Sequence, residues 1–529
     1  MPAQPAASRP RPEGRGAEQE GGTAVVSLGR LSAIVFVVGA ASLATEISAS
    51  RLVAPYFGSS TIVWANVIGL VLVYLSVGYW LGGRYADRNP TPRALGRILL
   101  VAAVALAILP FLSRPVLRLA IDAFTSVNVG VTVGSFLATL ILFSVPVTLL
   151  GMVSPCALRL GVTGVDNAGS VSGRLSSIGT AGAIVGTFAP AVVTIPLVGT
   201  ERTLVGAAVL VAGAAVPLLL RPAGIGAAAA VALLAVPPGA IKPVQGLIEE
   251  RDTRYGYAAV IREQDHLVLR TDEGVADQSV YRAGTALTGG EWDMPLIVPP
   301  LLGRPLRRVL VIGNGAGTTA RALAAVYPGI SVDGVEIDPE LTSLGRAYMG
   351  EDAIPGLTVI TSDGRTYLET TSARYDLVVV DAYHSAYVPF HLATQEFFSL
   401  VKDHLEAGGA VALNVARVPD DDALPRAIAG TLATVMPHAF RWRALRYNEL
   451  VFAVDGPLGL EGIRSGMGRL PAVVASLGPL VSAQAVAVDA ASDPLTDDRA
   501  PVEWITDRAV LDYVAHGGRF DEHLLPTAP

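Results

Sequence analysis

Cysteine is almost absent from this sequence, in which Cys156 is the only one among 529 residues. A single cysteine cannot form an intramolecular disulfide, so no disulfide framework holds the fold together. Charged residues are also scarce: they make up 16% of the chain, whereas a soluble domain contains about 25%. Apolar residues make up 51%, and the mean hydropathy is +0.49. A large part of the chain is therefore expected to contact lipid.

The sequence also lacks the clusters that mark two common kinds of binding site. Acidic residues are sparse between Leu31 and Ile241 and common afterwards, so the net charge of −7 belongs to the C-terminal half. There is no basic patch of the kind that binds nucleic acid, and no nucleic-acid partner is expected. The seven histidines and one cysteine show no metal-ligand spacing, so no metal site is expected either.

Residues 1–28 are rich in proline, glycine, arginine and glutamate and contain few large apolar residues. Such a segment cannot bury a core and is predicted to be a disordered tail. No cleavable signal pattern precedes the first apolar stretch, which is therefore predicted to be retained as a membrane span.

The chain between residues 29 and 244 is dominated by apolar stretches, most of which reach the length of about 20 residues that a helix needs to cross the hydrocarbon. Their interiors are rich in small residues, which suits close helix packing in lipid. We predict an all-α transmembrane domain of about seven helices, with six or eight also compatible. The stretches are about 31–50, 61–82, 97–113, 131–155, 175–198, 203–220 and 223–241.

An acidic residue, Glu46, lies late in the first apolar stretch, with Arg51 at its end. A carboxylate at that depth costs about 3 kcal/mol, so Glu46 should face the bundle and have a partner. Two interpretations remain open: a packing ion pair or interfacial residue, and a polar site for a cationic or amphipathic ligand.

The pattern changes at about residue 245, where charges appear and the apolar runs shrink to five or six residues. Residues 245–306 are predicted to form a small β-domain, with short strands between 255 and 282. After Arg307, strands alternate with helical patterns. This alternation predicts a Rossmann-like α/β domain with a doubly wound parallel sheet over residues 307–529.

A glycine-rich motif gives the strongest functional signal. The apolar run that begins at Val309 leads into Gly313, Gly315 and Gly317, after which a helix is predicted. Glycines let the backbone approach a ligand closely, and a helix N-terminus offers free N–H groups. The next strand ends in Glu336, at a spacing from Gly313 that suits a carboxylate accepting both ribose hydroxyls.

Two further strands also end in acidic residues. Asp363, followed by Gly364, ends one predicted strand, and Asp381 ends another. In open α/β sheets ligands bind at the carboxyl edge of the strands. Each aspartate alone is equally compatible with a helix cap, but three acids at successive strand ends favour a ligand site.

Taken together, these motifs resemble those of the polyamine aminopropyltransferase (spermidine synthase) family. The resemblance covers about half of the chain and is closest to a membrane-embedded bacterial branch, in which several spans precede the catalytic domain. The matching segments are 309–317, Val335-Glu336-Ile337-Asp338-Pro339, Asp363-Gly364, 376–381, Thr394-Gln395-Glu396-Phe397-Phe398, 405–409 and 495–503.

The resemblance implies a class I methyltransferase-type fold and a role for each residue. Gly313, Gly315 and Gly317 would hold the nucleoside, Glu336 its ribose, and Asp363 with Gly364 its adenine. Asp381 would be the catalytic base for the attacking amine, because a protonated amine is not a nucleophile. The co-substrate would be decarboxylated S-adenosylmethionine and the acceptor putrescine or a related amine. Because soluble members of the family tend to be dimers, the resemblance also implies a homodimer.

The sequence also departs from the family. Ala316 stands where the glycine loop normally has an aspartate, and His384 replaces an acid that follows the catalytic aspartate. The family's Tyr-His-Glu segment corresponds to Glu291-Trp292-Asp293, and the glutamine expected near Tyr255–Tyr257 is absent. Asp293, or Glu291 by position, is predicted to compensate in the acceptor site.

We expect Tyr383 and His384 to shape that acceptor site, although a packing or surface role is equally compatible with each of them. Ala316 leaves the cofactor open, because a loop without an acid also suits ordinary S-adenosylmethionine with its carboxylate. Two alternatives therefore accompany aminopropyl transfer: an S-adenosylmethionine-dependent methyltransferase, and a non-catalytic nucleoside-binding sensor or transporter.

Two observations conflict about the orientation of the protein in the membrane. The second loop of the membrane domain, between Gly82 and Arg97, contains four arginines and is predicted to be cytoplasmic. Seven spans would then place the C-terminal half outside. A nucleoside co-substrate of this class is made in the cytosol, which favours a multi-pass protein of the cell membrane with a cytoplasmic catalytic domain. Either one stretch does not span or the charge rule does not hold here.

Overall fold

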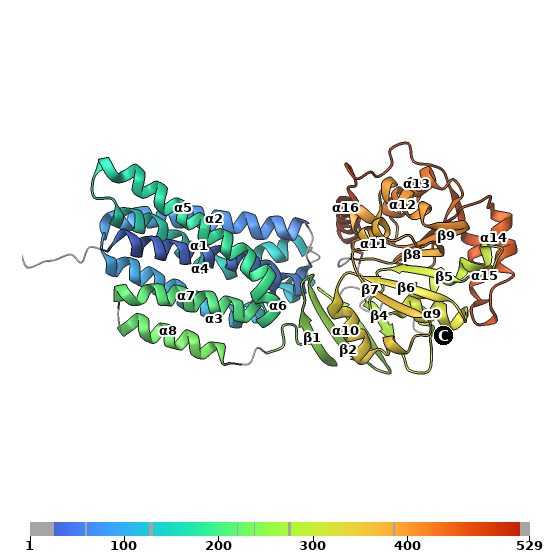
Figure 1. Ribbon diagram of the computed structural model, residues 1–529, viewed down its shortest axis with the longest axis horizontal. Helices are drawn as coiled ribbons and strands as arrows, with labels where there is room; N and C mark the ends of the chain where they lie inside the picture. The colour runs from blue at the N-terminus through green and yellow to red at the C-terminus, as the bar shows by residue number, and fades with distance from the viewer. Residues whose placement is uncertain are drawn as a thin grey trace, which may run out of the picture.

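The computed structural model describes residues 26–58, 61–125, 131–219, 221–236, 239–272, 277–383 and 387–518. A bundle of helices and an α/β domain lie end to end, with a small sheet between them (Figure 1). This arrangement confirms the predicted fold class. His384 and the N-terminal tail through Val25 lie outside the described residues.

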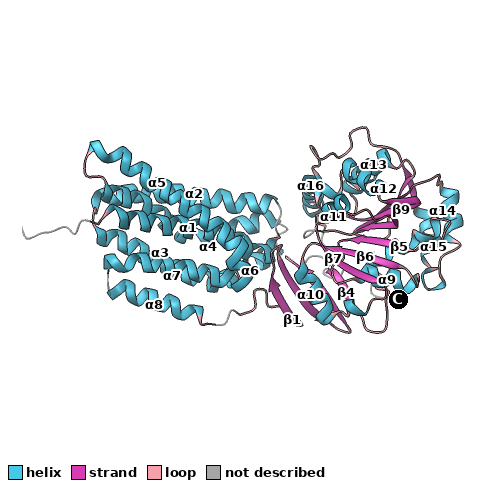
Figure 2. Ribbon diagram, in the orientation of Figure 1, coloured by secondary structure: helices cyan, strands magenta, loops and turns pink. Residues whose placement is uncertain are grey.

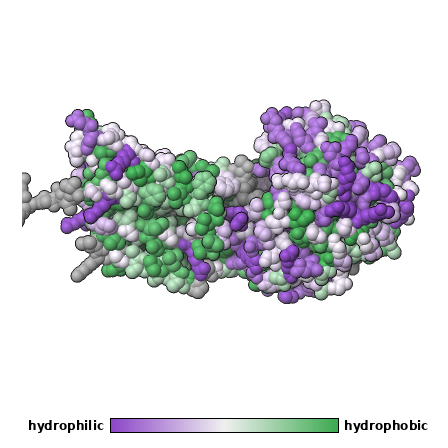
Figure 3. Space-filling model, viewed as in Figure 1, coloured by the Kyte–Doolittle hydropathy of each residue, from purple (hydrophilic) through white to green (hydrophobic). Residues whose placement is uncertain are grey.

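Six helical segments of the bundle are long and apolar enough to cross a membrane, which indicates a multi-pass membrane protein. The fifth segment continues from α5 through a π-helical turn, η1, into α6. Hydrophobic residues predominate on the visible surface of this half, as far as the narrow region between the two halves (Figure 3). The elements are α1 (Leu28–Phe57), α2 (Thr61–Arg88), α3 (Pro92–Thr125), α4 (Val131–Gly161), α5 (Val165–Ala189), η1 (Pro190–Thr194), α6 (Ile195–Val198) and α7 (Thr200–Leu219).

The seventh predicted stretch forms a shorter helix, α8 (Arg221–Leu234), of 14 residues. At 1.5 Å per residue it is roughly 21 Å long, less than the hydrocarbon thickness of about 30 Å. The long helices therefore number six rather than seven among the described residues. The chain nevertheless returns along α3: Gly226 lies against Leu100, and the carbonyl of Gly239 accepts a hydrogen bond from Arg114.

Glycines allow the first and fifth segments to pack closely. A Cβ added to Gly182 would overlap the backbone of Phe36, and one added to Gly186 would overlap that of Ala40. Small residues at such positions let helices approach in lipid, where apolar side chains gain little from meeting each other. This packing fixes η1 beside α1.

The end of α1 contacts the small sheet. Arg51 donates to the carbonyl of Thr253 at 3.0 Å and lies 3.9 Å from Asp252. Glu46, one turn earlier than Ser50, is half-buried and has no hydrogen-bond or ion-pair partner among the described residues. The ion pair expected for Glu46 within the bundle is therefore not found in the part of the chain that the structure describes.

The arginine-rich loop lies at the opposite end of the bundle. Gly96, near its end, packs against Leu219 at the end of α7, and Asp87 pairs with Arg159 at the end of α4. The start of α7 is at the end that meets the small sheet, because the Thr200 hydroxyl donates to Asp252. The α/β half and the arginine loop therefore lie at opposite ends of the bundle.

A four-stranded antiparallel sheet joins the two halves, as predicted for the small β-domain. Its strands pair in chain order: β1 (Leu247–Asp252), β2 (Tyr257–Glu263), β3 (His266–Thr271) and β4 (Asp277–Tyr281). One face of this small sheet packs on the glycine loop and on the helix over residues 339–348. The contact is made by Ala258 and Leu269 of the sheet, Ala316 of the loop and Leu344 of the helix. Residues 291–301, predicted to belong to this domain, form 3-10 turns η2 (Glu291–Ile297) and η3 (Pro299–Leu301), most of whose apolar side chains enter the core of the larger sheet.

The larger sheet has eight strands in the order β12-β10-β11-β9-β8-β5-β6-β7. Figure 2 shows β5, β6, β7 and β9 of this sheet with helices around them. The five strands from β9 to β7 are parallel, whereas β11, β10 and β12 are antiparallel, so the sheet is mixed rather than fully parallel. The strands are β5 (Arg308–Ile312), β6 (Ser331–Glu336), β7 (Leu357–Thr361), β8 (Tyr375–Val380), β9 (Leu405–Ala416), β10 (Ala439–Trp442), β11 (Asn448–Val454) and β12 (Val486–Val488).

Helices cover both faces of this sheet, and alternate residues of its central strands enter separate cores. Leu310 of β5 packs in one core with Phe397, and Val309 packs in the other with Phe452. The helices are α9 (Thr318–Val326), α10 (Pro339–Tyr348), α11 (Gly364–Thr370), α12 (Gln395–Asp403), α13 (Ala423–Val435), α14 (Leu460–Met467), α15 (Leu477–Gln484) and α16 (Val502–Ala515). Burial on both faces explains why β5 and β8 are continuous apolar runs.

Candidate functional site

The glycine loop follows β5 at the carboxyl edge of the larger sheet. Gly313 has φ +85°, and a Cβ there would overlap the backbone of Asp381. Gly315 has φ +54°, and a Cβ there would meet the hydroxyl of Ser279. The backbone conformation and the close approach both require glycine, so the loop lies flat between the end of β8 and the small sheet.

Glu336 ends β6 and is buried beside this loop. Its carboxylate accepts hydrogen bonds from the N–H groups of Gly315, at 2.8 Å, and Asp338, at 3.0 Å. Burial raises the pKa of Glu336 to about 7, although these backbone hydrogen bonds act in the opposite direction. The acid is thus fixed against the glycine loop.

Asp363 follows β7 and is the N-cap of α11. Its carboxylate accepts from the N–H of Thr366 at 2.9 Å and lies 3.1 Å from Nε2 of His391. Burial opposes ionisation, but the contacts with Thr366 and His391 outweigh it, so the pKa of Asp363 lies below its ordinary value. Asp363 is therefore a helix cap that also carries charge into the site.

Asp381 follows β8, and its backbone N–H pairs with the carbonyl of Ile312. One carboxylate oxygen accepts from the side-chain amide of Asn414 at 2.9 Å, and the other lies 3.4 Å from the Thr319 hydroxyl. Burial raises the pKa of Asp381 above its ordinary value, and these two hydrogen bonds offset only part of that effect. A raised pKa makes the carboxylate a stronger base, which suits a group that accepts a proton.

A cavity of about 560 Å³ brings these residues together, within the range of about 300–1,000 Å³ found for small-molecule sites. Of the residues predicted from the sequence, it is lined by Gly313, Gly315, Glu336, Asp363, Gly364, Asp381 and Tyr383. Gly317 is outside the lining: it has φ +80° and begins α9, with its backbone against Ile354.

Asp293 also lies outside the cavity lining. Its carboxylate accepts from the N–H groups of Thr288 and Gly289, at 3.0 and 2.7 Å, and so fixes the turn before η2. Burial raises the pKa of Asp293 to about 6. Glu291 is the acid of this segment that the charge of Asp381 affects: burial, and to a smaller extent the negative charge of Asp381, raise the pKa of Glu291 to about 8.

Tyr383 lines the cavity but is held by the sheet. Its hydroxyl donates to the carbonyl of Asn414 at 2.9 Å and accepts from the N–H of Ala416 at 2.6 Å. The ring therefore forms a fixed wall between the ends of β8 and β9. His384, the next residue, falls outside the described residues.

Ala316, which stands where the family has an aspartate, is fully buried. Its Cβ lies so close to α10 that a Cβ added to Gly345 would come within 2.9 Å of it. Its N–H donates to the Ser279 hydroxyl at 2.9 Å. A carboxylate could not replace this methyl group without moving α10, so the loop and helix are packed for a small residue.

Several residues of the site were not found from the sequence. Gln278 of β4 lines the cavity, across the small sheet from the segment where a glutamine was expected. Arg365 makes two hydrogen bonds to Asp497, at 2.7 and 2.6 Å, and so holds the turn at Asp363 from the C-terminal segment. The only sequence signal for this contact was the match of residues 495–503 to the membrane-embedded branch of the family.

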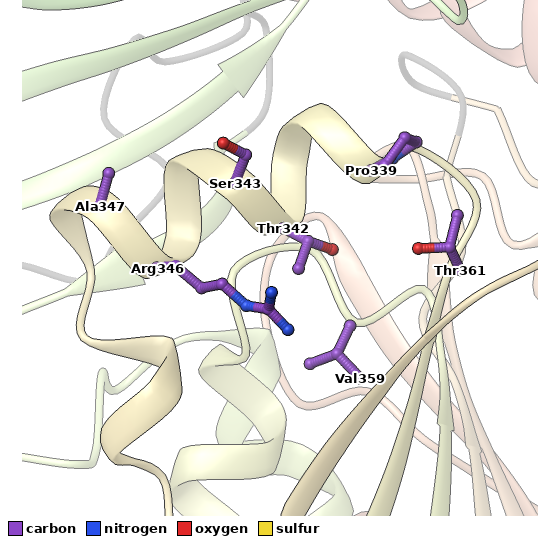
Figure 4. Close-up of a pocket in the computed structure, with 7 residues that line it drawn as sticks. All are labelled: Pro339, Thr342, Ser343, Arg346, Ala347, Val359 and Thr361. Carbon is purple, nitrogen blue, oxygen red and sulfur yellow. The ribbon is translucent and has the colours of Figure 1, made fainter.

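A second hollow lies on the outer side of α10, beside β7 (Figure 4). It is lined by Thr342, Arg346, Val359 and neighbouring residues, and contains no acid from a strand end. The larger cavity is therefore the candidate active site.

The sequence of this chain is similar to those of known proteins. The family described as "Spermine/spermidine synthase domain" matches residues 295–423. A probable polyamine aminopropyl transferase of Bifidobacterium longum is 33% identical over 39% of this chain and 47% of its own length. Polyamine aminopropyltransferase 2 of Streptomyces coelicolor is 28% identical over 76% of both chains, and that of Ralstonia nicotianae is 26% identical over 72% of this chain and 77% of its own.

The chain spans between 37% and 47% of the length of three of the curated relatives it matches. Among solved structures, a probable spermidine synthase from Corynebacterium glutamicum is similar with a TM-score of 0.36 and 19% identity, over 54% of this chain and 100% of the other. The long matches to the Streptomyces and Ralstonia relatives extend through the helical half. This chain belongs to the polyamine aminopropyltransferase family.

Proposed function

We propose that this protein transfers an aminopropyl group from decarboxylated S-adenosylmethionine to an amine acceptor at the membrane. The observation that carries the proposal is the position of Asp381: a buried carboxylate with a raised pKa, in one cavity with Glu336 and Asp363. Family membership supports the same reaction.

Glu336 and Asp363 bind the nucleoside in this proposal. The Glu336 carboxylate accepts from the ribose hydroxyls, and Asp363 accepts from the adenine amino group beside Gly364. The glycine loop leaves room for the backbone to approach the ligand. When bound, the sulfonium supplies an activated carbon and a neutral thioether leaving group.

Asp381 holds and deprotonates the acceptor amine. Its carboxylate takes a proton from the ammonium, and the freed nitrogen lone pair attacks the aminopropyl carbon next to sulfur. The new C–N bond forms as the C–S bond breaks, and its electron pair neutralises the sulfonium. Asn414 and Thr319 fix the carboxylate in position, and alignment of the two reactants contributes much of the rate.

A methyltransferase that uses ordinary S-adenosylmethionine is the second candidate. The observation that favours it is the buried methyl group of Ala316, which leaves that position of the loop without a carboxylate for the aminopropyl ammonium. The remaining acids, Asp381 and Glu336, favour a cofactor with more positive charge.

Calorimetry and mass spectrometry on the full chain in detergent distinguish these reactions. We expect tighter binding of the decarboxylated cofactor, and a product of putrescine or a related amine that is heavier by one aminopropyl group. A methylated product with ordinary S-adenosylmethionine would support the second candidate. Binding of a nucleoside without turnover of any amine would instead support a sensor or transporter.

The catalytic domain is proposed to be cytoplasmic, where the cofactor is made. The only native cysteine, Cys156, is buried in the bundle, so a cysteine introduced at the exposed Glu461 can report the side of the membrane. We expect a membrane-impermeant thiol reagent to label Glu461→Cys only after the cells are permeabilised. Labelling of intact cells would place the domain outside, as the arginine loop at the far end of the bundle suggests.

A further inference from the structure

The cavity at the carboxyl edge has two unlike walls. The catalytic half contributes the carboxylates of Glu336, Asp363 and Asp381. The wall opposite comes from the helical bundle and is mainly apolar or small. Its residues are Ile47, Ser50, Arg51 and Ala54 of α1, Trp64 of α2 and Ala191 of η1.

One edge of the bundle wall continues into a lipid-facing stripe. Trp64 is 39% exposed while it lines the cavity. Ile68 and Leu72 follow it at intervals of four residues along α2 and are also exposed. Residues four apart lie on one face of a helix, so an exposed apolar surface runs along α2 up to the rim of the cavity.

The other edge does the same on the fifth segment. Ile184, Phe188 and Val192 form an exposed apolar stripe, and Ala191 at its end lines the cavity. Leu197, still further toward the catalytic half, is 77% exposed. The exposed apolar surface thus extends to the level of the cavity and beyond it.

The helix is irregular where it meets the cavity. Residues 190–194 form a π-helical turn, in which Pro190 is buried and Ala191 is exposed. Turns of this kind are rare and are found frequently at functional sites. Here the turn places a small residue, rather than a bulky one, in the lining of the cavity.

We propose that a side opening between Trp64 and Ala191 admits the acceptor from the bilayer, and that the acceptor is a primary amine with a long apolar tail. The amine enters the acidic wall at Asp381, and the tail lies along Ile47 and Ala54 toward the lipid. This inference deepens the proposed aminopropyl transfer and rests on it. The C–N bond formed and the C–S bond broken are the same.

The charge along α1 suits such an amine. Glu46 precedes Ser50 and Ala54 by one and two turns, so it lies on the same stripe of α1, deeper in the bundle. Its half-buried carboxylate has no hydrogen-bond or ion-pair partner within the described ranges. A carboxylate at this depth attracts a cation, which draws a protonated amine toward the opening.

The test compares acceptors on the full chain in lipid nanodiscs, with decarboxylated S-adenosylmethionine as donor. Butylamine, octylamine, dodecylamine and putrescine are each assayed by mass spectrometry of the product. We expect kcat/KM to rise from butylamine to dodecylamine, because each buried methylene contributes up to about fourfold. Putrescine should be a poorer acceptor than dodecylamine.

Ala191→Trp, which narrows the opening, should lower the ratio of kcat/KM for dodecylamine over butylamine by at least about tenfold. Leu197→Trp is the matched control, because Leu197 is exposed on the same segment but does not line the cavity. A second variant, Trp64→Ala, changes the other side of the proposed opening. Nucleoside affinity, measured for each variant, reports correct folding.

The outcomes separate the two proposals. Transfer to putrescine without a gain for longer amines, and an unchanged ratio in Ala191→Trp, overturns the lipid route and leaves aminopropyl transfer intact. Equal losses in Ala191→Trp and Leu197→Trp also overturn the lipid route, because the opening would then have no particular role. Absence of aminopropyl transfer to every amine overturns the proposed function itself.

Discussion

The two halves of this molecule are stabilised in different ways. In the α/β half, buried apolar strands are sandwiched by helices, and buried acids such as Glu336 accept hydrogen bonds from the backbone. In the helical half, glycines such as Gly182 and Gly186 let helices touch backbone to backbone. The hydrophobic effect drives packing in the α/β half. In the helical half, close van der Waals contact must stabilise the helices instead, because lipid is as apolar as the side chains. The three strand-end acids of the candidate site lie in the half that satisfies its buried carboxylates with hydrogen bonds.

The largest expected effect removes that chemistry while leaving the fold. Asp381→Asn keeps the shape and the contact with Asn414 but cannot accept a proton. We expect kcat to fall by about 10²–10⁴-fold, with nucleoside affinity changed by less than about tenfold, as measured by product formation and calorimetry. Asp352→Asn, on an exposed side chain, is the control. A wild-type rate in Asp381→Asn would remove this residue from the mechanism.

The packing of the helical half predicts the next largest effect. Gly182→Leu forces a side chain into the backbone of Phe36, and overpacking costs about 1–3 kcal/mol. We expect a lower Tm for the bundle, measured by thermal aggregation in detergent. Gly213→Ala is the control, because a Cβ at Gly213 meets no atom within 4 Å. Equal Tm values would show that small residues are not what holds α1 against α5.

Acidity should change nucleoside binding at Glu336. Its pKa is about 7 because it is buried, so the acid loses its proton as the pH rises through 7. Only the carboxylate can accept from both ribose hydroxyls. Affinity for methylthioadenosine should therefore rise about tenfold between about pH 6 and 8. Calorimetry across this range measures the effect, and Glu336→Gln should abolish the pH dependence.

The smallest expected effect concerns the brace from the C-terminal segment. Arg365→Ala removes both hydrogen bonds to Asp497, and the turn at Asp363 loses its support. Because both side chains are partly exposed, the loss should be about 1 kcal/mol, or about fivefold in nucleoside affinity. Arg464→Ala, whose pair with Glu461 lies on the surface, should change nothing. No difference between the two variants would show that the brace is not needed.

The sequence was most informative where structure is local. The glycine loop, Glu336, Asp363 and Asp381 each follow directly from a strand, so the parallel topology alone brings them to one edge. The long apolar stretches likewise predicted membrane helices. The seventh stretch differs from the others, because α8 is apolar but ends after 14 residues, and six was among the numbers of spans that the sequence left open.

The rest depended on distant parts of the chain. Asn414 and His391 reach the site from segments that show no motif of their own, and the 495–503 segment, which includes Asp497, did not reveal its contact with Arg365. Asp293 could be assigned to the acceptor site by position, but its hydrogen bonds to the turn at Thr288 and Gly289 are visible only in three dimensions. The antiparallel pairing of β10, β11 and β12 could not be predicted either, because the residues of a strand do not determine its direction relative to its neighbours.

The central claim is that the carboxyl edge of the larger sheet binds a sulfonium nucleoside. A structure of the full chain with an unreactive sulfonium analogue tests it most directly. The account predicts ribose at Glu336, adenine at Asp363 and the sulfonium facing Asp381. An analogue bound elsewhere, or bound with its sulfonium turned away from Asp381, would contradict it.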